Sequence, residues 1–228
     1  MKIKRNYLAL IAATFITFVA TGQDTETRNL GSFDAISVGE AIDVEITKGN
    51  KEEAVVEVSG TDASNVLTDV FGGRLRVRMA KGNWRNVDVN VKVTYKELSD
   101  IEVSSAADLE TTNMLVSEEL EVDVSSAGDA KLMVQVKELQ VRVSSAGDLT
   151  VEGSAEEQFV RVSSSGDYDA YDLRSKYAEV DASSSGDARV FVEEKLDADA
   201  SSSGSVYYRG DPPKVYADSS SGGRVRKS

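Results

Sequence analysis

The sequence predicts an all-β solenoid of stacked coils, and three observations support this prediction. A short phrase of two serines, a serine or alanine, usually a glycine and usually an aspartate occurs seven times. The first serines of successive copies are 21, 19, 19, 20, 18 and 18 residues apart, and a near-constant period of about 20 residues is typical of a solenoid. Polar and apolar residues also alternate through and between the copies, as they do in strands. The copies are Ser104–Asp108, Ser125–Asp129, Ser144–Asp148, Ser163–Asp167, Ser183–Asp187, Ser201–Ser205 and Ser219–Gly223.

The alternation assigns each position of the phrase to one side of its coil. In residues 120–134 the even positions are apolar or small, whereas most odd positions are polar. Because successive side chains of a strand point to opposite faces, we expect the second serine and the glycine to point inward, and the first serine, third residue and aspartate to point outward. Glycine is also expected to mark the bend, since it adopts backbone conformations that other residues avoid. The candidate binding surface is the outward ladder of Ser125, Asp129, Ser144, Asp148, Ser163, Ser165, Asp167, Ser183, Ser185, Asp187, Ser201 and Ser203.

The core is expected to narrow toward the C-terminus. The inward residue before the phrase changes from Val103 in the first copy to Ala200 in the sixth and Asp218 in the last. Because Asp218 and Arg224 both fall on the inward register, the last coil is predicted to be a polar cap, as terminal repeats of solenoids commonly are. Three tyrosines on the inward register of the later coils would fill the space left by small residues: Tyr168, Tyr208 and Tyr216.

Residues 23–100 have the pattern of N-terminal β coils and a cap, which continue into the regular repeats of residues 101–228. Apolar residues alternate strictly with polar residues or alanine in the first part of this region. The segment Ile36–Val44 (ISVGEAIDV) is interpreted as a degenerate copy of the phrase, with Gly39 and Glu40 in place of glycine and aspartate.

Residues 1–22 are predicted to be a cleaved signal peptide. Three basic residues precede an apolar stretch from Tyr7 to Ala20, which has the length of a signal h-region and is short for a membrane span. An uncleaved N-terminal anchor is the alternative. No later stretch could span a bilayer, and a chain without cysteine has no lipoprotein anchor. We therefore expect an exported protein of the periplasm, the outer surface or the medium.

Composition excludes several classes of function. The chain has no cysteine and no histidine, which excludes disulfides, zinc sites of the Cys/His type and a Ser-His-Asp triad. Residues 1–22 carry three basic and no acidic residues, so the remaining chain has 23 basic and 39 acidic residues and a net charge of −16. Such a surface repels phosphate backbones and anionic lipids, and neither nucleic acid nor a membrane surface is an expected partner.

The aspartates of the phrase predict a row of like charges along the coils: Asp108, Asp129, Asp148, Asp167 and Asp187. Two unit charges about 5 Å apart in water repel by roughly 1 kcal/mol. Calcium between the coils would remove this repulsion, since it prefers carboxylate oxygens. However, the calcium-binding repeat G-G-x-G-x-D is not present, and each coil supplies one carboxylate. The sequence therefore predicts no cofactor, with calcium on this row as the alternative.

The order of several segments resembles a known family. The chain carries NLGSFDAISVGEAIDVEITKGN, VEVSG, GGRLRVRM and VKVTYKELSDIEVSSAADL in that order, followed by the serine-glycine repeats. Over residues 28–223 it resembles the putative auto-transporter adhesin, head GIN domain family, a set of exported bacterial proteins common in the Bacteroidetes. The resemblance implies a right-handed parallel β-helix and export from the cytoplasm. It implies no established activity and carries over no catalytic residues.

Regular outward rows on a rigid rod favour an extracytoplasmic, non-catalytic, adhesin-like protein that binds a glycan or an envelope or surface protein. Outward aromatic residues such as Tyr207 could stack on sugar rings. One alternative is a structural envelope protein that assembles through the unpaired strand edges of its terminal coils. A polysaccharide lyase or glycosidase is less favoured, because the connections between the phrases are too short to wall a cleft. The sequence does not indicate the ligand or the oligomeric state.

Overall fold

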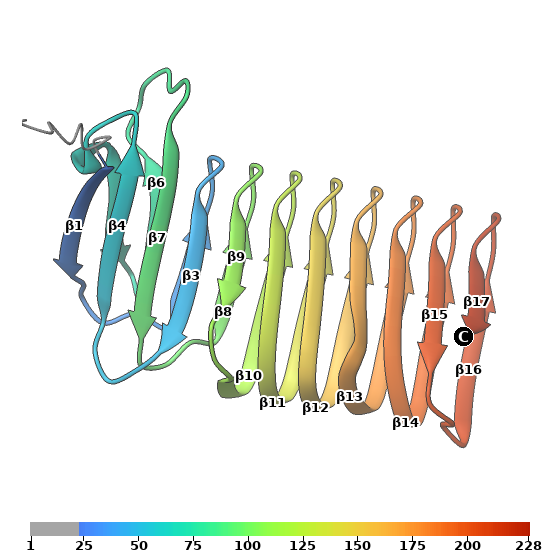
Figure 1. Ribbon diagram of the computed structural model, residues 1–228. Coiled ribbons are helices and arrows are strands. Elements are labelled where there is room, and N and C mark those ends of the chain that lie inside the picture. The colour runs from blue at the N-terminus through green and yellow to red at the C-terminus, as the bar shows by residue number, and fades with distance from the viewer. Residues whose placement is uncertain (1–22) are drawn as a thin grey trace, which may run out of the picture.

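The computed structural model describes residues 23–228, which form 17 strands in one continuous hydrogen-bonded sheet and a short 3-10 helix (Figure 1). The predicted signal peptide lies outside the described residues. The N-terminal elements are β1 (Gln23–Asn29), β2 (Ala35–Val38), β3 (Asp43–Lys48), β4 (Glu53–Ser59), η1 (Ala63–Asn65), β5 (Val66–Phe71), β6 (Arg74–Met79) and β7 (Asp88–Tyr95). The later strands are β8 (Asp100–Val103), β9 (Asp108–Thr111), β10 (Leu115–Val124), β11 (Asp129–Val143), β12 (Asp148–Val162), β13 (Asp167–Ala182), β14 (Asp187–Ala200), β15 (Ser205–Arg209), β16 (Lys214–Ser219) and β17 (Arg224–Lys227).

The coils have two walls, because each long strand bends in its middle. Strand β11 pairs in parallel with β12 from Asp129 to Val136 and again from Glu138 to Val143, and the pairing skips Lys137 at the bend. Figure 1 shows the bends along the bottom of the rod and the tight turns along the top. We call the wall made by Asp129–Val136 and its equivalents the first wall, and the wall made by Glu138–Val143 and its equivalents the second wall. The predicted fold class, an all-β solenoid, is thereby confirmed.

The N-terminal end of the rod differs in strand direction from the rest. Strand β4 pairs antiparallel with β1 on one side and β7 on the other, and β5 pairs antiparallel with β6. Strands β3 and β2 then pair in parallel with the first regular strands, β9 and β8. The antiparallel strands curl beside the solenoid and are continuous with its walls (Figure 1).

The core is a stack of inward side chains that narrows as predicted. Val124, Val143 and Val162 follow one another in register, and the series continues with two buried alanines, Ala182 and Ala200. Burial of these apolar side chains supplies the main favourable free energy of folding. Each added coil therefore extends one continuous core.

A buried hydrogen-bond network that the sequence pattern did not predict links β12, β13 and β14. Tyr168 is fully buried, as predicted, and its hydroxyl donates to the side-chain oxygen of Gln158 at 3.1 Å. The Gln158 amide donates to the Ser175 hydroxyl at 2.7 Å, which donates to the Phe191 carbonyl at 2.8 Å. Burial raises the pKa of Tyr168 far above that of a free tyrosine. Because the donors of Tyr168, Gln158 and Ser175 each have a partner in this network, these buried polar side chains are accommodated without an unpaired donor.

The serine phrase forms a four-residue turn, and its second serine lies at the tip. In the third copy the Gly147 N–H donates to the Ser144 carbonyl at 3.0 Å, and Ser145 and Ala146 have φ values of 53° and 59°. Two successive positive φ values with this hydrogen bond define a type I′ turn. The prediction that the second serine points inward is wrong, because the second serine is at the tip of the turn and does not belong to a strand. A turn of four residues leaves the even–odd count of the two flanking strands unchanged, so the sequence pattern does not reveal the turn. The exposed second serines are Ser105, Ser126, Ser145, Ser164, Ser184 and Ser202.

The glycine of the phrase does not make the bend, which corrects a second expectation. Gly147 is buried and has no positive φ. A Cβ atom on Gly147 would lie 2.8 Å from the carbonyl oxygen of Val124 in the preceding coil. The same close approach recurs where Gly166 meets Val143 and where Gly204 meets Ala182. Glycine therefore permits the close contact between coils at these copies, whereas Ala107 takes its place in the first copy.

The strand register corrects the position of the last copy of the phrase. Ala200 pairs with Ser219, so the last turn begins at Ser220, one residue later than predicted. Asp218 and Arg224 consequently point outward, and Val225 takes the inward position. The prediction of an inward-pointing polar cap is therefore wrong.

The same strand register determines which tyrosines are buried and how the degenerate copy aligns with the others. Tyr216 pairs with the outward Asp197 and is exposed, so its predicted burial is wrong, whereas Tyr208 packs against the core. In the degenerate copy Asp43 pairs with Asp108. The aspartate position is therefore taken by Asp43, and Gly39 and Glu40 correspond to the first and second serines.

The close approach at the glycines gives a stability prediction. Gly147→Ala should lower the free energy of unfolding by about 1–3 kcal/mol, because the added methyl group forces two coils apart. The neighbouring Ala146→Gly is the matched control and should cause little loss, since it removes a side chain from a residue with positive φ. Urea denaturation of both variants checks the prediction. Equal stability of Gly147→Ala and the parent chain would show that the coils are not limited by this contact.

Candidate functional site

The predicted binding residues lie together along the turn edge of the rod. The first serines are half-buried beside the turns, whereas Ser165, Ser185 and Ser203 are exposed at the tips. Successive turns are joined by a hydrogen bond from the third residue to the carbonyl of the next second serine; for example, Ala127 donates to Ser145 at 3.1 Å. The edge is therefore a continuous backbone ladder that carries small hydroxyl and methyl groups. The half-buried first serines are Ser125, Ser144, Ser163, Ser183 and Ser201.

The predicted aspartates form one row on the first wall, and a sixth residue joins them. Asp108, Asp129, Asp148, Asp167 and Asp187 pair in register from coil to coil. Asp43 extends this row in the N-terminal direction. The sequence contained a signal for Asp43, because it follows Val38 by the same five residues that separate Val103 from Asp108. We call these six residues the aspartate row.

Mutual repulsion and partial burial act on the aspartate row. Burial, followed by the negative charges of Asp167 and Asp129, raises the pKa of Asp148. Burial, followed by the charge of Asp108 and a hydrogen bond with it, raises the pKa of Asp43. Near the other end, the Arg189 guanidinium lies 2.6 Å from an Asp167 carboxylate oxygen and compensates its charge.

The aspartate row does not gather three carboxylates around one point. Each coil contributes one aspartate, and within residues 23–228 no group of three acidic side chains is arranged to hold a metal ion. Calcium on this row therefore has no further support from the side-chain geometry.

A second set of outward residues lies on the second wall, and sequence reasoning missed it. Glu121, Gln140, Phe159 and Glu179 pair in register, and the row continues through Asp197 to Tyr216. Around Phe159 the surface has two open hollows of about 280 and 230 Å³, which share Phe159 and Glu179. We call these joined hollows the second-wall groove.

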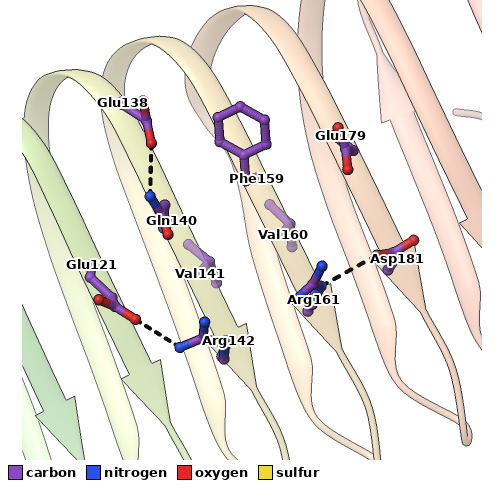
Figure 2. Close-up of a pocket in the computed structure, with 10 residues that line it drawn as sticks. All are labelled: Glu121, Glu138, Gln140, Val141, Arg142, Phe159, Val160, Arg161, Glu179 and Asp181. Atoms are coloured by element: carbon purple, nitrogen blue, oxygen red, sulfur yellow. Dashed lines mark hydrogen bonds and ion pairs between the residues drawn. The ribbon is translucent and has the colours of Figure 1, made fainter.

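Two ion pairs lie beside the Phe159 ring in the second-wall groove. Figure 2 shows Arg142 paired with Glu121 at 2.7 Å, Arg161 paired with Asp181 at 3.4 Å, and the Phe159 ring above them. Three aromatic side chains are exposed on this wall: Phe159 by 36%, Tyr177 by 38% and Tyr216 by 56%. They lie on successive or nearby coils, on β12, β13 and β16.

The aromatic side chains of the second wall are held by neighbouring groups. The Tyr177 hydroxyl donates to Glu194 at 2.8 Å, and the Lys195 ammonium lies 5.5 Å from the centre of the Tyr216 ring. Tyr207, the aromatic residue singled out from the sequence, is half-buried on the first wall between Arg189 and Arg226. The exposed rings therefore gather on the wall that the sequence did not indicate.

These features define a class of protein: a β-solenoid whose candidate sites are open rows of repeated side chains along its walls and turns. Among the described residues no helix is both long and apolar enough to cross a membrane. The chain belongs to the family described as putative auto-transporter adhesin, head GIN domain, whose model matches residues 32–212. Membership confirms the resemblance inferred from the sequence and implies an extracytoplasmic location.

Solved structures share this fold. A putative adhesin from Bacteroides fragilis NCTC 9343 is 19% identical and superposes with a TM-score of 0.83, covering 92% of this chain and 98% of its own. From Parabacteroides distasonis ATCC 8503, a putative adhesin (18% identity, TM-score 0.74) and a putative lipid binding protein (20% identity, TM-score 0.71) cover the same shares of the two chains. At these identities the likeness shows the fold alone. Comparison with curated proteins gives no match.

The aspartate row gives a prediction about pH. Because the folded-state pKa of Asp148 is raised, the folded protein binds more protons than the unfolded chain between the two pKa values. The destabilising contribution is therefore complete above the folded-state pKa and disappears as the pH falls toward the unfolded value, about 4. Asp148→Asn should raise the free energy of unfolding at pH 7, by less than about 1 kcal/mol because solvent screens the charges.

Urea denaturation at pH 7 and at about pH 4 measures this difference, which should shrink at the lower pH and at high salt. Asp100→Asn is the matched control, because Asp100 accepts two hydrogen bonds from Arg74, at 2.9 and 2.5 Å. That variant should lose stability at pH 7. An Asp148→Asn protein that is no more stable than the parent at low salt and pH 7 would contradict the account of repulsion along the row.

Proposed function

We propose that this protein is an exported, non-catalytic, adhesin-like binding module that contacts an extended glycan or an envelope protein along its walls. The observation that carries the proposal is the register of the coils, which repeats outward side chains in straight rows across β10 to β16. Neighbouring parallel strands lie about 4.8 Å apart, so each row offers similar groups at a constant interval. A partner with its own repeat could then make the same contact several times.

The shape of the surface supports binding over catalysis. The hollows of the described surface are open, and their acidic side chains are partly engaged in ion pairs such as Arg142 with Glu121. Hydrolases and lyases require two carboxylates, or a metal with a base, directed at one bond in a cleft. The family of putative adhesins agrees with a binding role. A net charge of −16 after residue 22 further disfavours nucleic acid as the partner.

Binding assays with labelled residues 23–228 test the proposal. We expect saturable binding to at least one glycan of a broad array or to intact bacterial or host cells. An unrelated β-rich protein of similar negative charge serves as the control for non-specific contact. No binding above that control in either format would overturn the proposal.

The non-catalytic part of the proposal needs a separate measurement. Incubation with neutral and acidic polysaccharides should release no reducing ends and no unsaturated sugars. Release that scales with protein concentration would instead identify a polysaccharide-degrading enzyme.

A further inference from the structure

We propose that the second-wall groove binds a neutral polysaccharide chain, with Phe159 and Tyr177 as the stacking platforms. The proposal rests on the proposed binding function and assigns it a site and a class of ligand. The two rings belong to neighbouring strands, β12 and β13, and both lie beside the hollow of about 230 Å³. Phe159 also borders the hollow of about 280 Å³ (Figure 2).

The exposed rings are unusual for this chain. Outward positions elsewhere on the regular coils are mostly charged, hydroxylated or small, whereas Phe159 has Gln140 on one side and Glu179 on the other. A single exposed apolar residue needs no explanation. Two exposed rings, Phe159 and Tyr177, border hollows lined with amide and carboxylate groups. This is the composition of a sugar site, in which rings stack and a few polar groups fix the orientation.

The polar groups of the groove can bond to sugar hydroxyls. Gln140 keeps its carbonyl oxygen for a ligand, while its amide nitrogen donates to Glu138 at 2.8 Å. Carboxylates such as Glu179 accept hydrogen bonds from hydroxyl groups, and guanidinium groups donate them. The interval between coils, about 4.8 Å, is close to the length of one sugar ring in an extended chain. A polysaccharide lying along the rod would therefore meet an equivalent row position at each ring.

Charge selects the class of polysaccharide. Six acidic and three basic side chains line the two hollows, which gives a net charge of −3. This potential repels uronic acids and sulfated or phosphorylated sugars. The acidic residues are Glu121, Glu138, Glu157, Glu179, Asp181 and Asp197, and the basic residues are Arg142, Arg161 and Lys195.

The same composition argues against a protein partner at this groove. The buried centre of a protein–protein interface is depleted of charged residues. Here the rings have carboxylates such as Glu157 and Glu179 as neighbours. These carboxylates would be desolvated under a flat protein surface, which is costly when they are not paired. Beneath a hydrated sugar chain, the same carboxylates keep hydroxyl groups and water as partners.

Affinity electrophoresis tests the assignment with the folded chain of residues 23–228. Gels contain mixed-linkage β-glucan, xyloglucan, mannan or hydroxyethylcellulose as neutral probes, and polygalacturonate or alginate as acidic probes. We expect retardation by at least one neutral polymer and by no acidic polymer. Because stacking is not electrostatic, the retardation should persist at 0.5 M salt, about three times physiological ionic strength.

Variants locate the site. Phe159→Ala should weaken retardation by roughly three- to tenfold, in keeping with the loss of one aromatic stacking contact. Tyr177→Ala should weaken it as well, whereas Tyr177→Phe retains the ring and should retain binding. Phe71→Ala is the matched control, because Phe71 is 76% exposed on β5, outside the groove. Circular dichroism and thermal melting confirm that each variant is folded.

The outcomes separate this assignment from the general proposal. If a neutral polymer binds and folded Phe159→Ala binds as tightly as the parent, the groove is not the site, although the binding function stands. If no neutral polymer binds but the protein still binds cells, or if only acidic polymers bind, the ligand class is wrong. If nothing binds in any assay, both proposals fail.

Discussion

Parallel hydrogen bonding between successive coils is the interaction on which the rest of the structure depends. It fixes the register of neighbouring strands, for example Val124 beside Val143 and Val143 beside Val162. Once register is fixed, the two-residue alternation of a strand decides which side chains enter the core and which remain outside. The backbone approaches closely at the turns that carry glycine, and at Gly147 an added side chain would meet the carbonyl of Val124 in the preceding coil.

The turns combine local strain with bonds between coils. At every tip but the last, two residues hold positive φ values without being glycine, as Ser145 and Ala146 do, and such a conformation costs roughly 1–2 kcal/mol per residue. The hydrogen bond from each tip to the next, 3.1 Å from Ala146 to Ser164, recurs along the whole edge. An isolated turn of this sequence would have little reason to form, whereas a stack of them stabilises every member. Serine suits these positions because it is small and remains solvated.

Much of this architecture could be predicted from the sequence, because the period and the alternation express the stacking directly. The narrowing of the core from Val103 to Ala200 and the burial of Tyr168 followed from the alternation alone. At the turn tips the alternation gave a wrong prediction, an inward second serine. A turn with an even number of residues leaves the even–odd pattern of the flanking strands uninterrupted, so the pattern does not show where the strand ends. It also failed for Tyr216, because a single residue of shift in the last copy exchanges inside and outside.

The second-wall groove could not be predicted, because it depends on alignment between coils of unequal length. Phe159 lies 19 residues after Gln140 but 20 before Glu179, and the pairing of β13 with its neighbours shifts register in the first wall. A fixed repeat length would have matched Phe159 with a different neighbour. Gln158 is the inward residue just before Phe159 and accepts a hydrogen bond from Tyr168. Its position likewise depends on how the strand bends.

The two walls use the same register to opposite electrostatic effect. On the first wall the register places aspartate next to aspartate, and partial burial together with this repulsion raises the pKa values of Asp43 and Asp148, so the outward row opposes folding. On the second wall Arg142 reaches Glu121 on the neighbouring strand and Arg161 pairs with Asp181, so these two ion pairs offset part of the acidic charge of the groove. A ligand at the second wall therefore meets guanidinium groups whose charges are already compensated. Its contact must come from ring faces and hydrogen bonds, which depend little on ionic strength, whereas any contact at the first wall would be governed by net charge.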